Sequence, residues 1–152
     1  MKLVAVIAIV AAVSLTGCIT RTMTLPPGFV RIEDANVGQY AVRGMSADGV
    51  MIALRAEKNP QNGNLAFWSQ AIATQMVSGR GYKAAGSEDV TSAAGTPGRL
   101  LTFTLQKQGV QFTYLLTVFV QGDEILLGEA GGKSGDVEPK LAEIRKALLT
   151  AR

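Results

Sequence analysis

The chain has 152 residues, of which 15 are Lys or Arg and 12 are Asp or Glu, giving a formal net charge of +3. Charged residues make up only 18% of the sequence and form no basic run, so the composition does not support nucleic-acid binding. The sequence contains no histidine, which excludes Ser-His-Asp and Cys-His catalysis and nearly all zinc sites.

The N-terminal residues begin with a positive charge, continue as an uncharged apolar run and end at a cysteine. Lys2 precedes the apolar residues 3–13, and small and polar residues then lead to Leu15-Thr16-Gly17-Cys18. The apolar run is well short of the roughly 20 residues that a bilayer-spanning helix needs. It therefore predicts a signal peptide rather than a membrane span.

The Leu15-Thr16-Gly17-Cys18 motif resembles a bacterial lipobox, and Cys18 is the only cysteine of the chain. The resemblance implies that residues 1–17 are removed and that Cys18 becomes an N-terminus thioether-linked to a diacylglycerol. We therefore expect a lipid-anchored protein of the bacterial cell envelope. By resemblance to bacterial lipoprotein sorting rules, Ile19 rather than Asp after the cysteine implies the outer membrane, with the domain facing the periplasm or the cell surface.

Residues 18–24 are polar and predict a tether, and residues 25–152 are expected to form a single domain. Leu25-Pro26-Pro27-Gly28 excludes regular helix, because proline lacks a backbone N–H, and leads to a strand at residues 29–32. Strands at residues 40–43 and 50–54 flank Asp48-Gly49, which predicts a hairpin because both residues tolerate a positive φ.

Residues 58–64 are rich in Asn, Pro and Gly and predict a loop before a helix over residues 65–78. Asn64 is the expected N-cap and Gly79 the expected helix stop. Apolar residues recur at spacings of three and four, which is typical of a helix face packed on a core. The residues of this face are Leu65, Phe67, Trp68, Ala71, Ile72 and Met76.

The second half of the chain contains the strongest strand signals. A short strand at residues 82–85 and a polar loop at residues 86–97 precede strands at residues 100–105, 112–120 and 125–129. The short connections between these three strands predict an antiparallel meander. In the middle strand, Tyr114, Leu116 and Val118 alternate on one face while Leu115 and Phe119 lie on the other, which predicts a central strand covered on both sides.

The C-terminal residues predict a flexible link and a final helix. Residues 131–135 are rich in glycine, and the helix is expected over residues 137–150, with Asp136 as its N-cap. The spacing of Leu141, Ile144 and Leu148 predicts that these three side chains are buried.

The order of these elements resembles the PsbP-like fold, named for the extrinsic photosystem protein. The patterns Gly98-Arg99-Leu100-Leu101 and Tyr114-Leu115-Leu116-Thr117-Val118-Phe119-Val120 contribute to the resemblance, which covers most of residues 25–150. It implies an α+β domain with a central antiparallel sheet and helices packed on its faces. Members of this family are mostly accessory or binding subunits, so the resemblance implies a binding role and carries over no catalytic residue.

No catalytic, metal-binding or cofactor-binding constellation stands out in the sequence. The adjacent acidic pairs Glu33-Asp34, Glu88-Asp89 and Asp123-Glu124 fall in predicted loops. We interpret them as solvated turn residues, because neighbours on an extended chain point in opposite directions. Residues 128–134 resemble a phosphate-binding loop, but Leu127 stands where such a loop needs its first glycine, so no nucleotide is expected.

These observations predict a membrane-anchored, non-catalytic binding or accessory subunit of the bacterial cell envelope. The expected partners are the membrane, held through lipid on Cys18, and an envelope protein, with no nucleic acid, nucleotide or cofactor. Protein contacts are expected from the loops at residues 58–64 and 86–97, neither of which contains an aromatic anchor. An envelope hydrolase using carboxylate or lysine chemistry, and a carrier of a small apolar ligand, remain alternatives.

Overall fold

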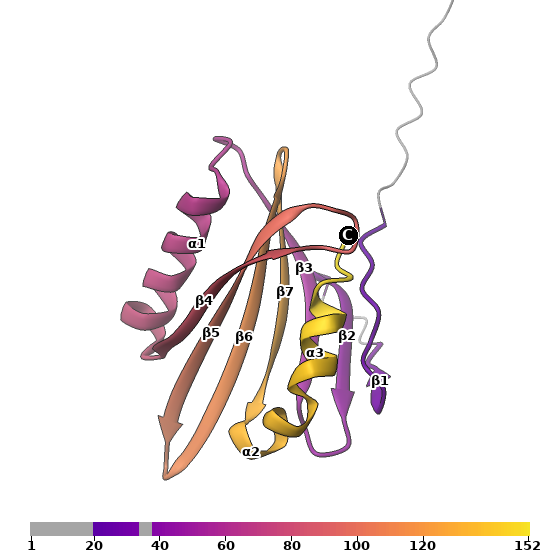
Figure 1. Cartoon of the computed structure of the whole chain (residues 1–152), viewed down its shortest axis with the longest axis vertical. Helices are drawn as coiled ribbons and strands as arrows, with labels where there is room; N and C mark the ends of the chain where they lie inside the picture. Colours follow the sequence, from indigo (N-terminus) through magenta and orange to yellow (C-terminus); the bar gives the residue numbers. More distant parts are fainter. Residues whose placement is uncertain (1–19, 34–37) are drawn as a thin grey trace, which may run out of the picture.

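The computed structural model describes residues 20–33 and 38–152, which form one antiparallel sheet with a helix on each face (Figure 1). The sheet has seven strands in the order β1-β2-β3-β7-β6-β5-β4. This architecture confirms the predicted α+β class. The strands are β1 Phe29–Arg31, β2 Tyr40–Ser46, β3 Met51–Lys58, β4 Lys83–Thr91, β5 Pro97–Lys107, β6 Val110–Gln121 and β7 Glu124–Lys133. The helical elements are α1 Leu65–Thr74, the π-helical turn η1 Gln75–Gly79, α2 Ser134–Val137, the 3-10 turn η2 Glu138–Lys140 and α3 Leu141–Leu148.

The predicted hairpin and meander are both present. Strands β2 and β3 pair through a tight turn in which Gly49 has a φ of +88°, and Ser46 N donates to Val50 O at 2.9 Å. Strands β5, β6 and β7 pair consecutively, and each is longer than the sequence pattern indicated. Because β3 also pairs with β7, the hairpin and the meander form one continuous sheet.

Strand β6 is buried on both faces, as predicted. Leu116 and Val118 belong to the hydrophobic cluster under α1, and Leu115 and Phe119 belong to the cluster under α3. All four side chains are no more than 2% exposed. The domain therefore has two cores, one on each side of the sheet.

Helix α1 begins where expected, because the Asn64 side chain accepts a hydrogen bond from Phe67 N at 2.8 Å. Trp68 and Ile72 are half-buried against the core, although we expected full burial, and Met76 is buried. The prediction for Phe67 is wrong, since this side chain is 58% exposed. It lies one position outside the apolar face and points to solvent.

The C-terminal helix is shorter than predicted. Pro139 lies within the 3-10 turn η2 Glu138–Lys140 and has no N–H to continue an α-helix, so α3 begins only at Leu141. Asp136 lies inside α2 and does not act as an N-cap. Ile144 and Leu148 are fully buried, whereas Leu141, expected in the core, is 36% exposed.

Two segments expected as loops are strands. Residues 86–91 belong to β4, the edge strand of the sheet, and only residues 92–96 turn towards β5. Residues 131–133 belong to β7, where glycine permits close approach rather than flexibility. A Cβ on Gly131 would lie 2.9 Å from the Tyr114 ring, and one on Gly132 would lie 3.2 Å from the Val50 side chain.

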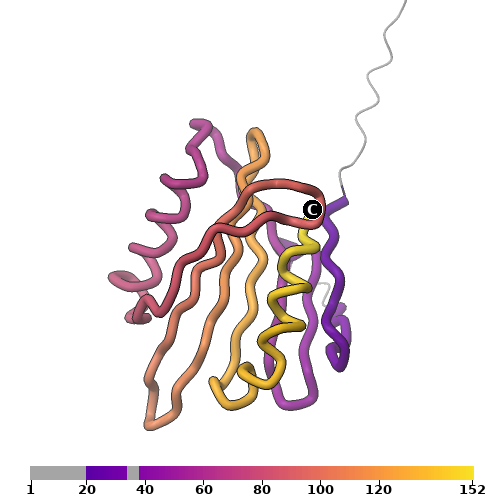
Figure 2. Tube along the Cα trace, in the orientation of Figure 1, coloured from indigo at the N-terminus to yellow at the C-terminus, as the bar shows by residue number. Residues whose placement is uncertain are grey.

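The expected tether is packed against the domain where it can be described. Thr22 N donates to Arg152 O at 2.8 Å, and Arg152 N donates back to Thr22 O at 3.1 Å. Met23 is buried in the core, and Figure 2 shows this segment running beside the C-terminus. The predicted signal peptide at residues 1–17 and Cys18 lie outside the described residues.

We predict that Leu116→Ala lowers the free energy of unfolding by about 2–5 kcal/mol, because it leaves a cavity at the centre of the sheet. Urea denaturation measures this change. Val110→Ala, at a position that is 38% exposed, is the control and should change stability by less than about 0.5 kcal/mol. Equal losses in the two variants would contradict the central position of β6.

Candidate functional site

The sheet face that carries α1 is only partly covered. Helix α1 packs on β5 and β6, whereas β2, β3 and the end of β7 on this face lie under none of the described helices. We call this uncovered part the open face. It surrounds a cavity of about 130 Å³, whose lining includes Tyr40, Arg43, Met51, Ala53, Tyr114 and Glu129.

Strand register brings these residues together. Ala53 of β3 lies opposite Glu129 of β7. Met51 of β3 and Tyr114 of β6 both lie opposite Gly131 of β7, from its two sides. The open face is therefore assembled from segments distant in sequence, with the small residues of β3 and β7 as its floor.

A half-buried ion pair crosses the open face. Arg55 Nε donates to Glu129 Oε1 at 2.6 Å, and Arg55 Nη1 forms a second ion pair with Glu57. The Arg55 and Glu129 side chains are 23% and 13% exposed, so water reaches both only in part. Loss of either partner would leave a poorly hydrated charge, which is more costly than loss of a surface ion pair.

Tyr114 lies beside this ion pair and stays neutral. Burial raises the pKa of its hydroxyl well above the ordinary value of 10.0, and the Glu129 carboxylate raises it further. Its ring packs 5.8 Å from the Tyr82 ring, between the centroids. Tyr114 can therefore serve as a hydrogen-bond donor at neutral pH and is a poor candidate for a general base.

The residue types of the open face are typical of protein interfaces. Its rim carries Arg43, whose guanidinium carbon lies 5.5 Å from the centre of the Tyr40 ring, a favourable cation–π geometry. Tyr, Arg and Met are enriched at interface centres. The cavity of about 130 Å³ is smaller than the roughly 300–1,000 Å³ of most small-molecule pockets. The open face thus fits a protein surface better than a small ligand.

A second surface lies at the predicted loop before α1. Strand β3 extends to Lys58, so the loop comprises residues 59–64. Asn59 is 1% exposed and organises the loop: its Oδ1 accepts from Gly63 N at 2.8 Å and from Trp68 Nε1 at 2.9 Å. Its Nδ2 donates to Gly122 O at 3.2 Å. The loop is thereby joined to the turn between β6 and β7.

The loop contains no aromatic residue of its own, but two aromatic side chains of α1 lie beside it. Phe67 and Trp68 pack edge to face, with 5.2 Å between ring centroids. With residues 60–64 they line a groove of about 410 Å³. We call residues 59–64 together with Phe67 and Trp68 the aromatic loop. The Asn64 cap fixes where α1 begins, and this places Phe67 in the first turn of the helix. The cap is therefore the sequence signal that could have located an exposed aromatic side chain beside the loop.

The other sequence-derived candidates do not converge. Cys18 and Asp34 lie outside the described residues. The acidic residues of the described pairs are dispersed over the surface, and several form ion pairs with arginine. These pairs are Glu88 with Arg145, Asp89 with Arg99 and Glu124 with Arg21. Within residues 20–33 and 38–152 no group of three or more His, Cys, Asp or Glu side chains could hold a metal ion.

We predict that the stability contributed by the Tyr114 hydroxyl is lost at high pH. Its folded pKa is raised above its unfolded value, so the contribution is complete below about pH 10 and falls as the pH rises further. Urea denaturation should show the stability advantage of wild type over Tyr114→Phe shrinking between about pH 9 and about pH 11. A constant difference over this range would contradict the burial of Tyr114.

Comparison with known proteins identifies the fold. No protein-family model and no curated protein matches the chain. Cyanobacterial PsbP (CyanoP) from Synechocystis sp. PCC 6803 superposes with a TM-score of 0.63 at 10% identity, covering 88% of this chain and 86% of that one. LpqN of Mycobacterium tuberculosis, described as involved in cell envelope biogenesis, superposes with a TM-score of 0.61 at 14% identity. The match covers 84% of this chain and 79% of that one.

A eukaryotic structure shares the same arrangement. The Ran-binding protein Mog1p of Saccharomyces cerevisiae gives a TM-score of 0.59 at 10% identity, covering 86% of this chain and 84% of that one. Identities this low establish the fold alone. The chain has the PsbP/Mog1-like α+β fold, which confirms the PsbP-like resemblance inferred from the order of its elements.

Proposed function

We propose that the protein is a lipoprotein of the bacterial cell envelope, anchored through Cys18, and that it acts as a non-catalytic binding subunit. Its protein partner docks on the open face. The Leu15-Thr16-Gly17-Cys18 motif supports the anchor. Within the described residues, no helix is long and apolar enough to span a membrane.

The observation that carries the binding role is the half-buried Arg55–Glu129 pair, whose Glu129 lines the cavity of the open face together with Tyr40 and Tyr114. Residues around it are already ordered by strand register and ion pairing, so a partner would meet a preformed surface. Preorganisation lowers the entropy that binding loses. Docking would also exclude the remaining water from the ion pair and strengthen it.

The same geometry favours binding over the two alternative functions, an envelope hydrolase and a carrier of a small apolar ligand. Glu129 and Glu57 are both engaged by Arg55, and the raised pKa of Tyr114 keeps its hydroxyl protonated. This arrangement supports recognition more than proton transfer. The cavity of the open face, at about 130 Å³, is also below the roughly 300–1,000 Å³ of most small-molecule pockets, which disfavours a carrier of a small apolar ligand at this face.

The fold is compatible with this role without establishing it. LpqN, described as involved in cell envelope biogenesis, has the same fold, as does cyanobacterial PsbP. Our proposal for this chain rests on its own lipobox-like motif and its own open face.

Photo-crosslinking in the native envelope tests the proposal. A benzophenone side chain at Met51, on the open face, should yield one adduct of defined mass. The same group at Leu141, exposed on α3 across the sheet, should yield none. Arg55→Met should abolish the adduct, whereas Arg145→Met, which removes an exposed arginine paired with Glu88, should preserve it.

Three results would contradict the proposal. Intact mass spectrometry of the purified protein must show lipid on Cys18 and loss of residues 1–17, so an unmodified Cys18 refutes the anchor. Equal crosslinking from Met51 and Leu141, or an adduct unaffected by Arg55→Met in a variant with native circular dichroism, refutes the open face as the docking site.

A further inference from the structure

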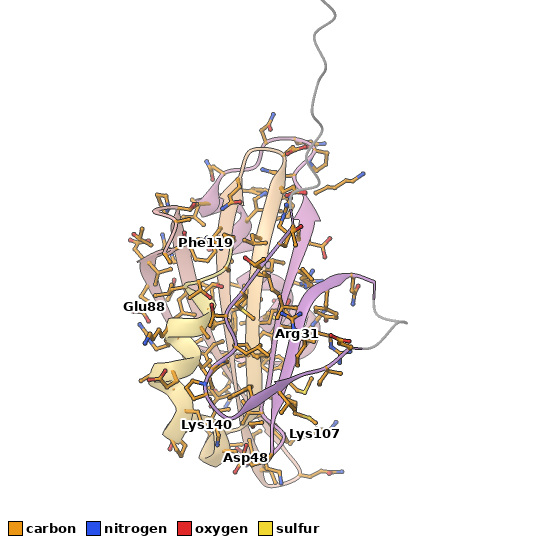
Figure 3. All side chains as sticks on the ribbon, turned by 90° about the vertical axis from the view of Figure 1, so that its right-hand side faces the viewer. Arg31, Asp48, Glu88, Lys107, Phe119 and Lys140 are labelled. Carbon is orange, nitrogen blue, oxygen red and sulfur yellow. The ribbon has the colours of Figure 1, made fainter. Side chains whose placement is uncertain are left out.

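Several separate segments meet at the end of the domain where the described chain begins. Residues 21–24, the loop at 59–64, the turns at 92–96 and 121–124, and residues 150–152 form this end, which we call the anchor end. Figure 1 shows the start of the described chain and the turn between β6 and β7 towards this end, and Figure 3 labels Lys107 and Asp48 at the opposite end. The anchor end is therefore a defined surface made from the connections at one end of the strands.

Hydrogen bonds and an ion pair hold these segments together. Arg21 forms an ion pair with Glu124, and Asn59 N donates to Asp123 O at 2.6 Å. Gln121 Nε2 donates to Thr96 Oγ1 at 3.3 Å. These contacts join the entering chain, the aromatic loop and the two turns to one another.

The chain is fixed to the domain from Thr22 onward, four residues after Cys18 in the sequence. Thr22 and Arg152 exchange two backbone hydrogen bonds, Thr24 N donates to Thr150 Oγ1 at 2.8 Å, and Met23 is buried in the core. We call these contacts of residues 22–24 the clasp. Because of the clasp, residues 22–24 add no length to a tether.

Covalent geometry then limits how far the domain can stand from its lipid. Cys18 precedes Arg21 by three residues, and an extended residue spans at most about 3.6 Å, so their Cα atoms lie within roughly 11 Å. A diacylglycerol on the Cys18 sulfur resides in the bilayer. Arg21, where the chain joins the anchor end, must therefore stay within roughly 11 Å of the lipid-bearing cysteine at the membrane surface.

The anchor end also carries an exposed aromatic side chain. Phe67 is 58% exposed beside the groove of the aromatic loop, and the loop is braced through Asn59 to the turn at residues 121–124. Transfer of apolar and aromatic side chains from water to a membrane interface is favourable. Charges of both signs occur at this end, as Arg21 and Glu124 show, so anionic lipid is not required.

We propose that the domain rests directly on the bilayer that holds its lipid, with the anchor end against the membrane and Phe67 in the interfacial region. This inference rests on the proposed lipid at Cys18. The occupant of the groove beside Phe67 is then lipid, which leaves the open face, on the side of the sheet, accessible to the protein partner.

Fluorescence quenching in vesicles tests this orientation. The lipidated protein is reconstituted in phosphatidylcholine vesicles containing spin-labelled lipid, with an environment-sensitive fluorophore on Gln61→Cys or Lys107→Cys. Cys18 is the only native cysteine and its sulfur is a thioether, so each label is specific. The 12 residues of β6, at about 3.3 Å each, separate the two ends by roughly 40 Å, so we expect at least about fivefold stronger quenching at Gln61.

Two variants test the cause of the contact. A flexible insertion of about ten Gly and Ser residues after Thr20 should reduce quenching at Gln61 to the level at Lys107, because it restores a tether. Phe67→Ser should weaken quenching at Gln61 by about half. Val77→Ser, at the other end of the same helical segment and 41% exposed, should not change it.

The outcomes separate this inference from the proposed function. An unmodified Cys18 in the intact mass of the same sample would overturn both. Lipidated protein with equal quenching at Gln61 and Lys107, or with quenching unaffected by the insertion, would overturn the orientation while leaving the anchor in place.

Discussion

Burial of strand β6 on both faces is the constraint on which the rest of the structure depends. Leu116 and Val118 face one hydrophobic cluster and Leu115 and Phe119 face the other, so each side of the sheet requires a cover. Helix α3 covers one side and α1 covers part of the other. Because α1 packs on β5 and β6, strands β2 and β3 and the end of β7 stay uncovered on the same side of the sheet. The open face is therefore a consequence of where α1 packs.

The parts of the fold that the sequence predicted have local signals. The alternation in β6, the Asp48-Gly49 turn and the Asn64 cap each depend on a few consecutive residues. Strand β4 was predicted only over residues 82–85, and its continuation to Thr91 was interpreted as a loop. An exposed edge strand shows no apolar alternation, while its backbone pairing with β5 needs none. Leu141 was misplaced because it is the first residue of α3, at the end of the helix, where it is 36% exposed, while Ile144 and Leu148 further along the same helix are buried.

The open face could not be predicted, because its members are distant in sequence. Arg55, Tyr114 and Glu129 come from three strands and meet only through the register of β3, β7 and β6. Alternation places Tyr114 on the same face as Leu116, but no local pattern indicates that α1 leaves this region uncovered. Gly131 did carry a signal, which we interpreted as flexibility and which instead reports the close approach of the Tyr114 ring.

The clasp connects the fold to the proposed function, because it decides whether lipid on Cys18 holds the domain closely or loosely. Amide hydrogen exchange at Thr22 in the lipidated protein tests this point most directly, since Thr22 N donates to Arg152 O at 2.8 Å. We predict exchange slower than that of an unstructured amide by about a hundredfold or more. Exchange at the unstructured rate would mean that the residues before Leu25 form a free tether, and it would contradict this account.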